Sequence, residues 1–103
     1  MSAYENIMNR RSIRKYTGEP IGGEDIRKIL AAGMAAPSCV NARDWSFLVV
    51  QNRDILNGMA DANGRSAEPP RQAQLGILVL GDLERAFPRA RDYWVVDCAI
   101  AAK

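Results

Sequence analysis

Two short segments carry the side chains that could do chemistry, and the first is a basic segment near the N-terminus. Residues 10–16 read Arg-Arg-Ser-Ile-Arg-Lys-Tyr, within a stretch from residue 6 to residue 18 that contains no acid. Guanidinium groups hold phosphate oxygens by paired, charge-assisted hydrogen bonds, and a serine hydroxyl adds another donor. The basic segment therefore predicts a phosphate site. Two other interpretations remain, a solvated face at a helix end and a nucleic-acid contact with steep salt dependence.

The second segment, which we call the proline–serine loop, is residues 35–45, Ala-Ala-Pro-Ser-Cys-Val-Asn-Ala-Arg-Asp-Trp. Small residues and a rigid proline let the backbone approach a flat ligand closely, and Ser38 and Asn41 can hydrogen-bond its polar edge. The alternative is a simple helix-to-strand connection with a core tryptophan. Cys39 has two interpretations as well, a redox-sensitive thiolate or a small packing residue.

Taken together and in this order, the two segments resemble the FMN-dependent nitroreductase family. The pattern is R-R-S-x-R-x-Y after a first helix, followed by A-P-S-x-x-N-x-x-x-W-x-F-x-V-V leading into a strand. The apolar segment Trp94 to Ala102 also looks like the start of the family's long central helix. This chain has Arg43-Asp44 where the family usually has Gln-Pro before the tryptophan.

The resemblance implies an α+β fold with a central antiparallel sheet flanked by helices. It implies an oxidoreductase that uses FMN to transfer electrons from NAD(P)H to a nitroaromatic, quinone or related acceptor by a ping-pong mechanism. The flavin carries the electrons, so no side chain need act as acid or base. Family members are intertwined homodimers with two flavin sites at the interface.

The resemblance also assigns roles to individual residues. The ribityl phosphate and the pyrimidine side of FMN would be held by Arg10, Arg11, Ser12 and Arg14. The flavin bound mainly to the other subunit would be contacted by Pro37, Ser38, Cys39 and Asn41.

Local sequence patterns predict the elements that must position these residues. Ser2 and Glu5 fit a capping box, which predicts a short helix through about Met8. Apolar residues at helical spacing predict a second helix that Pro37 ends, with the stripe Ile26, Ile29, Leu30, Gly33 and Met34.

Further along the chain, two apolar runs predict strands at 45–50 and 75–80, the second covered on both faces. Ile55 and Met59 predict a short helix ending near Asn63-Gly64. Residues 61–74 contain Pro69-Pro70 and no large apolar side chain, and we expect an exposed loop there. Residues 93–102 predict an apolar helix interrupted only by Asp97.

Composition excludes several classes of protein. Its 103 residues allow one domain at most. Net charge is +2, which argues against a nucleic-acid or polybasic membrane partner. With no histidine and with Cys39 and Cys98 far apart, zinc fingers, histidine triads and other metal sites are not expected. No apolar run reaches the roughly 18 residues of a membrane span, and we expect a cytoplasmic protein.

The last predicted helix has no stop signal before Lys103. We therefore expect residues 1–103 to form a single, partial domain of the nitroreductase type, truncated at its C-terminus. The alternative to the enzyme is a non-catalytic, truncated fragment that acts only through dimerisation or partner binding.

Overall fold

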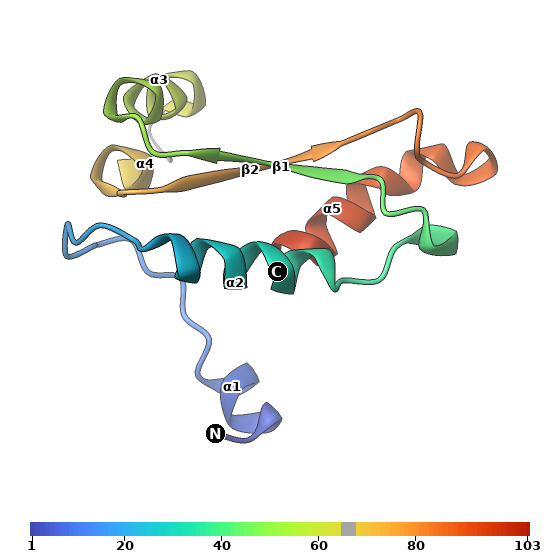
Figure 1. Ribbon diagram of the computed structural model, residues 1–103, viewed down its shortest axis with the longest axis horizontal. Coiled ribbons are helices and arrows are strands. Elements are labelled where there is room, and N and C mark those ends of the chain that lie inside the picture. The colour runs from blue at the N-terminus through green and yellow to red at the C-terminus, as the bar shows by residue number, and fades with distance from the viewer. Residues whose placement is uncertain (65–67) are drawn as a thin grey trace.

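The structure is a computed structural model that describes residues 1–64 and 68–103. Its centre is an antiparallel pair of strands, β1 (Trp45–Val50) and β2 (Gly76–Gly81), in which Trp45 lies opposite Gly81 and Val50 lies opposite Gly76. The helices lie around this pair, as Figure 1 shows; they are α1 (Ala3–Met8), α2 (Gly23–Met34), α3 (Arg53–Asn63), α4 (Glu68–Gln72) and α5 (Trp94–Ala102). The predicted α+β class with a central antiparallel sheet is confirmed.

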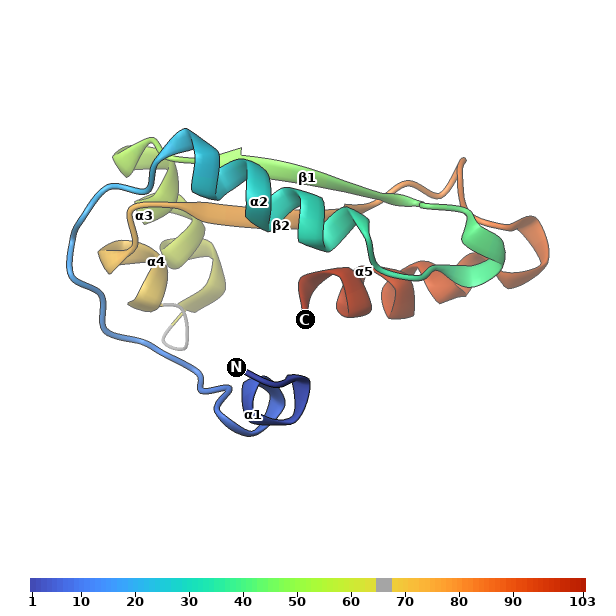
Figure 2. The same ribbon diagram turned by 60° about the horizontal axis from the view of Figure 1, so that its bottom comes forward.

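Helix α1 forms where the capping box predicts it. The Glu5 N–H donates to Ser2 Oγ, and the Ser2 N–H donates to the Glu5 carboxylate at 2.8 Å. All six residues of α1 are exposed, and Tyr4 and Ile7 are each 71% accessible. In Figure 2 the helix lies apart from the sheet, at the end of the extended segment that leads to α2.

Helix α2 packs its apolar stripe against β1 and α5. The close approach is at Gly33, where an added Cβ would lie 3.1 Å from Phe47 Cζ and 3.5 Å from the Ala101 carbonyl oxygen. Helix α2 ends at Met34 with Ala35 as its C-cap, as the sequence predicts. The end of this helix delivers the chain directly into the proline–serine loop.

The two faces of the sheet are covered unequally. Alternation along the strands places Phe47, Val49, Ile77 and Val79 on the face toward α2 and α5. The opposite face is covered at one end by α3, where Leu56 lies over Gly76 and is 1% exposed. Leu48, Leu78 and Leu80 on that face remain 49%, 43% and 42% exposed. The expectation that β2 is covered on both faces was therefore wrong within this chain, because nothing in the described residues packs over its middle.

The expected loop at residues 61–74 is also corrected. Residues 61–63 belong to α3, and residues 68–72 form α4; residues 65–67 lie outside the described part. Prolines at the start of a helix lose no hydrogen bond, because the first N–H groups of a helix have no partner in it. Arg53 stabilises the C-terminal part of α4, because its guanidinium donates to the carbonyl oxygens of Pro70 at 2.6 Å and Ala73 at 2.9 Å.

Helix α5 forms as predicted, and it begins after a 3₁₀ segment at Pro88–Tyr93. Its buried residues are Asp97 and Cys98, whereas Val95, Val96 and Ile100 are 55%, 48% and 43% exposed. Helix α5 is thus apolar nearly all round, yet it buries its one acid. In the described ranges, no helix is long and apolar enough to cross a membrane.

Candidate functional site

The basic segment has neither helix nor strand, and every residue in it is exposed. Arg11 Nη1 donates to the carbonyl oxygens of Met8 at 2.9 Å and Arg10 at 2.8 Å. This places a cation on the unsatisfied carbonyl end of α1, where the helix dipole favours positive charge. The Arg11 guanidinium is therefore already partly engaged by the backbone.

Arg10 and Arg14 are less engaged than Arg11. Arg10 Nη1 lies 3.4 Å from Ser12 Oγ, a long hydrogen bond between two exposed side chains. Arg14 has no hydrogen-bond or ion-pair partner among residues 1–64 and 68–103. These two guanidinium groups, with the Ser12 hydroxyl between them in the sequence, are available to an anion such as a phosphate.

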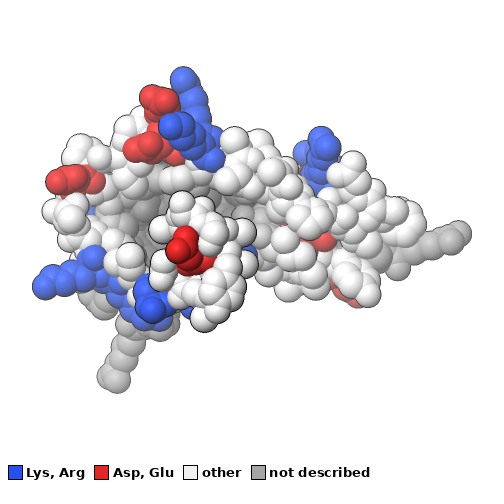
Figure 3. Space-filling view, turned by 90° about the horizontal axis from the view of Figure 1, so that it is seen from below, with Lys and Arg blue, Asp and Glu red and all other residues white. Residues whose placement is uncertain are grey.

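The basic residues do not merge into one surface. Figure 3 looks at the side from which α1 projects, and shows Lys and Arg side chains in separate groups with uncharged and acidic residues between them. Nucleic-acid binding relies on a continuous basic patch or stripe. The visible face therefore supports a local anion site rather than the nucleic-acid interpretation.

The proline–serine loop is held in shape by its own polar groups. A 3₁₀ turn, η1 (Cys39–Asn41), follows Ser38, whose Oγ accepts a hydrogen bond from the Arg43 N–H at 2.9 Å. Arg43 Nε donates to Asn41 Oδ1 at 3.2 Å. The Ser38 hydroxyl hydrogen and the Asn41 amide N–H groups remain as donors, so the loop can still present them to a ligand.

The backbone of the loop is strained at three positions. Val40, Asn41 and Arg43 have φ values of 51°, 55° and 50°, in the left-handed region that disfavours residues with a side chain. Valine is especially unsuited to this region because it is branched at Cβ. Such strain clusters at ligand sites and needs surrounding contacts to hold it.

One such contact comes from α5. The Cys39 N–H donates to Asp97 Oδ1 at 2.9 Å, a bond that joins residues 58 positions apart. Asp97 is 3% exposed, so the bond lies where water competes little. Asp97, the one acid of this apolar helix, thus accepts a hydrogen bond from the loop that follows α2.

Asp44, at the end of the loop, is the buried acid that sequence reasoning did not single out as functional. It is 1% exposed, and neither of its carboxylate oxygens has a hydrogen-bond partner in the described part of the chain. Burial, then the neighbouring Asp97 carboxyl, raises the pKa of Asp44, and Arg85 opposes this weakly. The sequence feature that could have pointed to Asp44 is the departure from the family pattern, which places an acid directly before Trp45.

Cys98 lies beside the same two acids. Burial raises the pKa of its thiol first, and the Asp44 and Asp97 carboxyls add to the shift. Cys98 therefore remains a protonated, buried thiol. Cys39 and Cys98 are both free, and the described residues hold no group of three or more Cys, Asp or Glu side chains that could bind a metal ion.

The structure does not bring the two candidate segments together within one chain. The basic segment precedes α2 and the proline–serine loop follows it, so the 12-residue helix of roughly 18 Å stands between them. Figures 1 and 2 agree in placing α1 and η1 at different sides of the molecule.

Each segment instead lines a hollow of its own. Ser38 and Cys39 line one of about 260 Å³ with Val96 and Ile100 of α5. Lys15 and Tyr16 line another, of about 560 Å³, with residues 73–75. The two segments therefore do not form one site within residues 1–64 and 68–103.

Comparison with known proteins gives a family. Residues 7–102 match the sequence profile of the nitroreductase family. A candidate NADH dehydrogenase/NAD(P)H nitroreductase of Methanothermobacter thermautotrophicus is 38% identical over all of this chain and 52% of its own length. The chain spans about half the length of the curated relatives it matches.

Solved structures agree with the sequence match. A candidate NADH dehydrogenase/NAD(P)H nitroreductase from Bacteroides thetaiotaomicron superposes with a TM-score of 0.85 at 41% identity, covering 97% of this chain and 56% of its own. A candidate nitroreductase from Desulfovibrio desulfuricans, crystallised in complex with FMN, gives 0.75 at 35% identity, covering 96% and 60%. Because the family profile covers nearly the whole sequence and the fold agrees, this chain belongs to the nitroreductase family.

Proposed function

We propose that the protein is an FMN-dependent oxidoreductase that passes electrons from NAD(P)H to a nitroaromatic, quinone or related acceptor. The proposal is supported chiefly by the structural similarity to the Desulfovibrio desulfuricans relative. That relative was crystallised in complex with FMN, and the superposition covers 96% of this chain. Bound FMN would supply the electron carrier, taking an electron pair from the nicotinamide and giving it to the acceptor. The protein's own residues would bind and orient it.

The basic segment fits the phosphate end of FMN. Arg10 and Arg14 have exposed guanidinium groups, and Ser12 offers a hydroxyl. We assign these three residues to the ribityl phosphate. Arg11 would add a positive potential and keep the end of α1 in place, because its guanidinium is bound to two carbonyl oxygens.

The proline–serine loop fits the ring system. Pro37 and Cys39 offer apolar surface beside η1, and Ser38 and Asn41 keep hydrogen-bond donors free. The Cys39 N–H is committed to Asp97, so Cys39 would contribute contact surface rather than a backbone hydrogen bond. We assign these four residues to the flavin held mainly by the other subunit.

A homodimer would unite the two segments. They lie at opposite ends of α2 in one chain, which fits a site shared between two copies. The exposed apolar side chains of α1 support it, because a six-residue helix with no buried residue is unstable alone in water. The radius of gyration of 15.3 Å also exceeds the roughly 13 Å of a compact chain of this size.

The test is purification of the intact gene product and measurement of its absorbance. We expect a yellow protein with a flavin band, or a colourless one that takes up added FMN, and oxidation of NADH or NADPH when an acceptor is present. Size-exclusion chromatography should show a dimer. A colourless protein that fails to take up FMN would contradict the proposal and favour the alternative, a non-catalytic fragment that acts through dimerisation or partner binding.

A further inference from the structure

A long-range hydrogen bond joins Asp97 to the strained loop at Cys39. The acceptor is a carboxylate oxygen on a regular helix, and the donor is a backbone N–H in the 3₁₀ turn. A charged acceptor gives a stronger hydrogen bond than a neutral one. The bond therefore fixes the one turn of the loop that contains the left-handed residues Val40 and Asn41.

A second buried carboxyl, that of Asp44, lies near this contact. The groups near Asp44 are Asp97 and Cys98 from α5 and Arg85 from the segment after β2. Two ionised carboxylates close together in a buried place repel strongly. Asp44 is the one whose oxygens lack partners, whereas Asp97 accepts from Cys39. Burial and the neighbouring Asp97 carboxyl accordingly raise the pKa of Asp44.

We infer that Asp97 is a positioning residue for the proline–serine loop. Asp97 holds the Cys39 N–H and thereby sets the positions of Ser38 and Asn41. This inference rests on the proposed function in one respect, namely that the loop contacts FMN. The link between α5 and the loop is independent of that assignment.

The role of Asp44 follows from its position in the chain. Its backbone carbonyl oxygen accepts from the Asp82 N–H at 2.6 Å, which ties the end of the loop to the segment after β2. Its buried side chain fills space near Asp97. Asparagine has the same shape and no charge, so it should replace Asp44 in this role.

The experiment compares Asp97→Ala, Asp97→Asn, Asp44→Asn and a control, Asp92→Asn, which removes an exposed acid five residues from Asp97. Amide hydrogen exchange, followed by NMR on the FMN-free protein, reports the Cys39 N–H directly. Amides of α3, such as that of Ala60, report global stability.

We expect Asp97→Ala to speed exchange at Cys39 by about tenfold or more while the α3 amides keep their rates. The exchange rate at Cys39 in Asp97→Asn should lie between the rates in Asp97→Ala and in the native protein, because the amide oxygen of asparagine remains an acceptor. Asp44→Asn and Asp92→Asn should leave Cys39 unchanged. The inference is overturned if the exchange rate at Cys39 is unchanged in Asp97→Ala. It is also overturned if the exchange rates of the α3 amides rise as much as the rate at Cys39 does. Asp44→Asn behaving like Asp97→Ala overturns the role of Asp44. If Asp97→Ala does not fold, the exchange rate at Cys39 in Asp97→Asn, compared with the rates of the α3 amides, tests the inference instead.

FMN titration of the same variants connects the loop to the ligand. We expect Asp97→Ala to weaken FMN binding by about tenfold, roughly 1.4 kcal/mol, with partial rescue in Asp97→Asn. Faster exchange at Cys39 with unchanged FMN affinity would overturn the positioning role. Failure of the native protein to bind FMN would instead contradict the proposed function, and the exchange data would still decide whether Asp97 holds the loop.

Discussion

The indole ring of Trp94 lies over Gly81, in the space that any side chain at position 81 would occupy. Trp94 begins α5 and Gly81 ends β2, so this contact brings the helix onto the sheet at the point where β1 begins with Trp45. Three residues further along α5, Asp97 reaches the proline–serine loop. The glycine thus sets the position of the helix that supports the candidate flavin loop.

Replacement of Gly81 by alanine should destabilise the protein. The new Cβ would overlap the Trp94 indole and force the ring or the helix to move, at a cost of about 1–3 kcal/mol. Urea unfolding followed by tryptophan fluorescence measures this. Gly58→Ala is the matched control, because nothing lies within 4 Å of that position and alanine should stabilise α3 by about 0.8–1 kcal/mol. Equal effects of the two changes would contradict the contact.

Stability should depend on pH through Asp44. Burial and Asp97 raise its pKa above the ordinary value of 3.8, so the folded protein keeps a proton that the unfolded chain has released. The contribution of Asp44 is complete below pH 3.8 and is lost as the pH rises through the folded pKa. Asp44→Asn cannot titrate, and it should gain stability over the native protein as the pH rises.

Urea unfolding at a series of pH values from acid to neutral measures the difference. The free energy of unfolding of Asp92→Asn, which removes an exposed acid, should depend on pH in the same way as that of the native protein. A gap between Asp44→Asn and native that is the same at every pH would show that Asp44 titrates normally.

The phosphate assignment predicts weaker FMN binding when the free guanidinium groups are removed. Arg10→Ala and Arg14→Ala should each cost about 1.5–3 kcal/mol of binding free energy, the range for a hydrogen bond to a charged group. Flavin fluorescence titration gives the Kd. Arg27→Ala removes an exposed arginine from α2 and should leave the Kd unchanged. Native affinity in both the Arg10 and Arg14 variants would remove the assignment.

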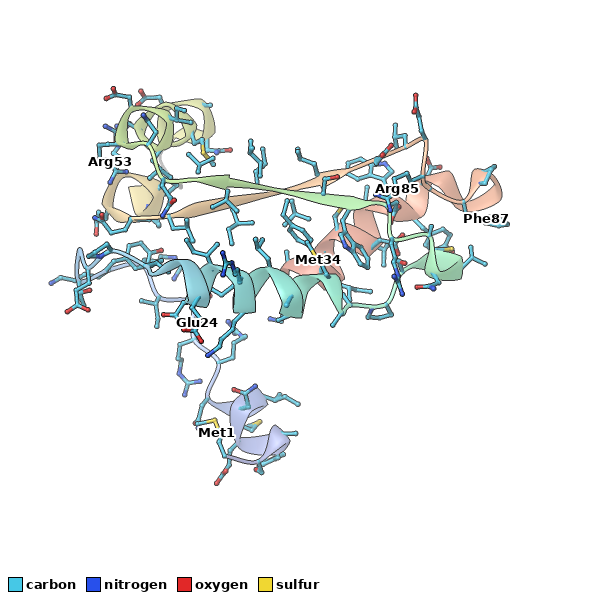
Figure 4. All side chains as sticks on the ribbon, viewed as in Figure 1. Met1, Glu24, Met34, Arg53, Arg85 and Phe87 are labelled. Carbon is cyan, nitrogen blue, oxygen red and sulfur yellow. The ribbon has the colours of Figure 1, made fainter. Side chains whose placement is uncertain are left out.

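Arg53 should be needed for the order of α4. Figure 4 shows Arg53 at the end of the molecule where α3 and α4 lie together, and its two hydrogen bonds reach Pro70 and Ala73. Arg53→Ala should speed exchange at the Ala73 amide, which bonds to the Pro69 carbonyl at 3.0 Å. Arg53→Lys should rescue only partly, because lysine lacks the fork that serves two carbonyls. Full rescue by lysine would indicate that charge alone matters.

Much of the local structure could be predicted because short-range patterns encode it. The Ser2–Glu5 capping box predicts α1, helical spacing predicts α2, and the aromatic and β-branched run predicts β1 at Trp45–Val50. The error at residues 61–74 has a physical cause as well. Helix α4 depends on Arg53, which is 17 and 20 residues away from the two carbonyl oxygens to which it donates. No short stretch of sequence around Pro69-Pro70 contains that contact.

The sequence by itself determined the family, the order of elements and which residues could hold a phosphate and a flat ring, because these depend on residue types at fixed spacings. The tertiary structure alone decided that the basic segment and the proline–serine loop lie at different sides of the molecule. It also decided that Asp97 holds Cys39 and that the buried carboxylate oxygens of Asp44 have no hydrogen-bond partner among the described residues. The physical reason is that burial and long-range hydrogen bonds arise only when α5 packs against the sheet, and the chain brings together residues 58 positions apart.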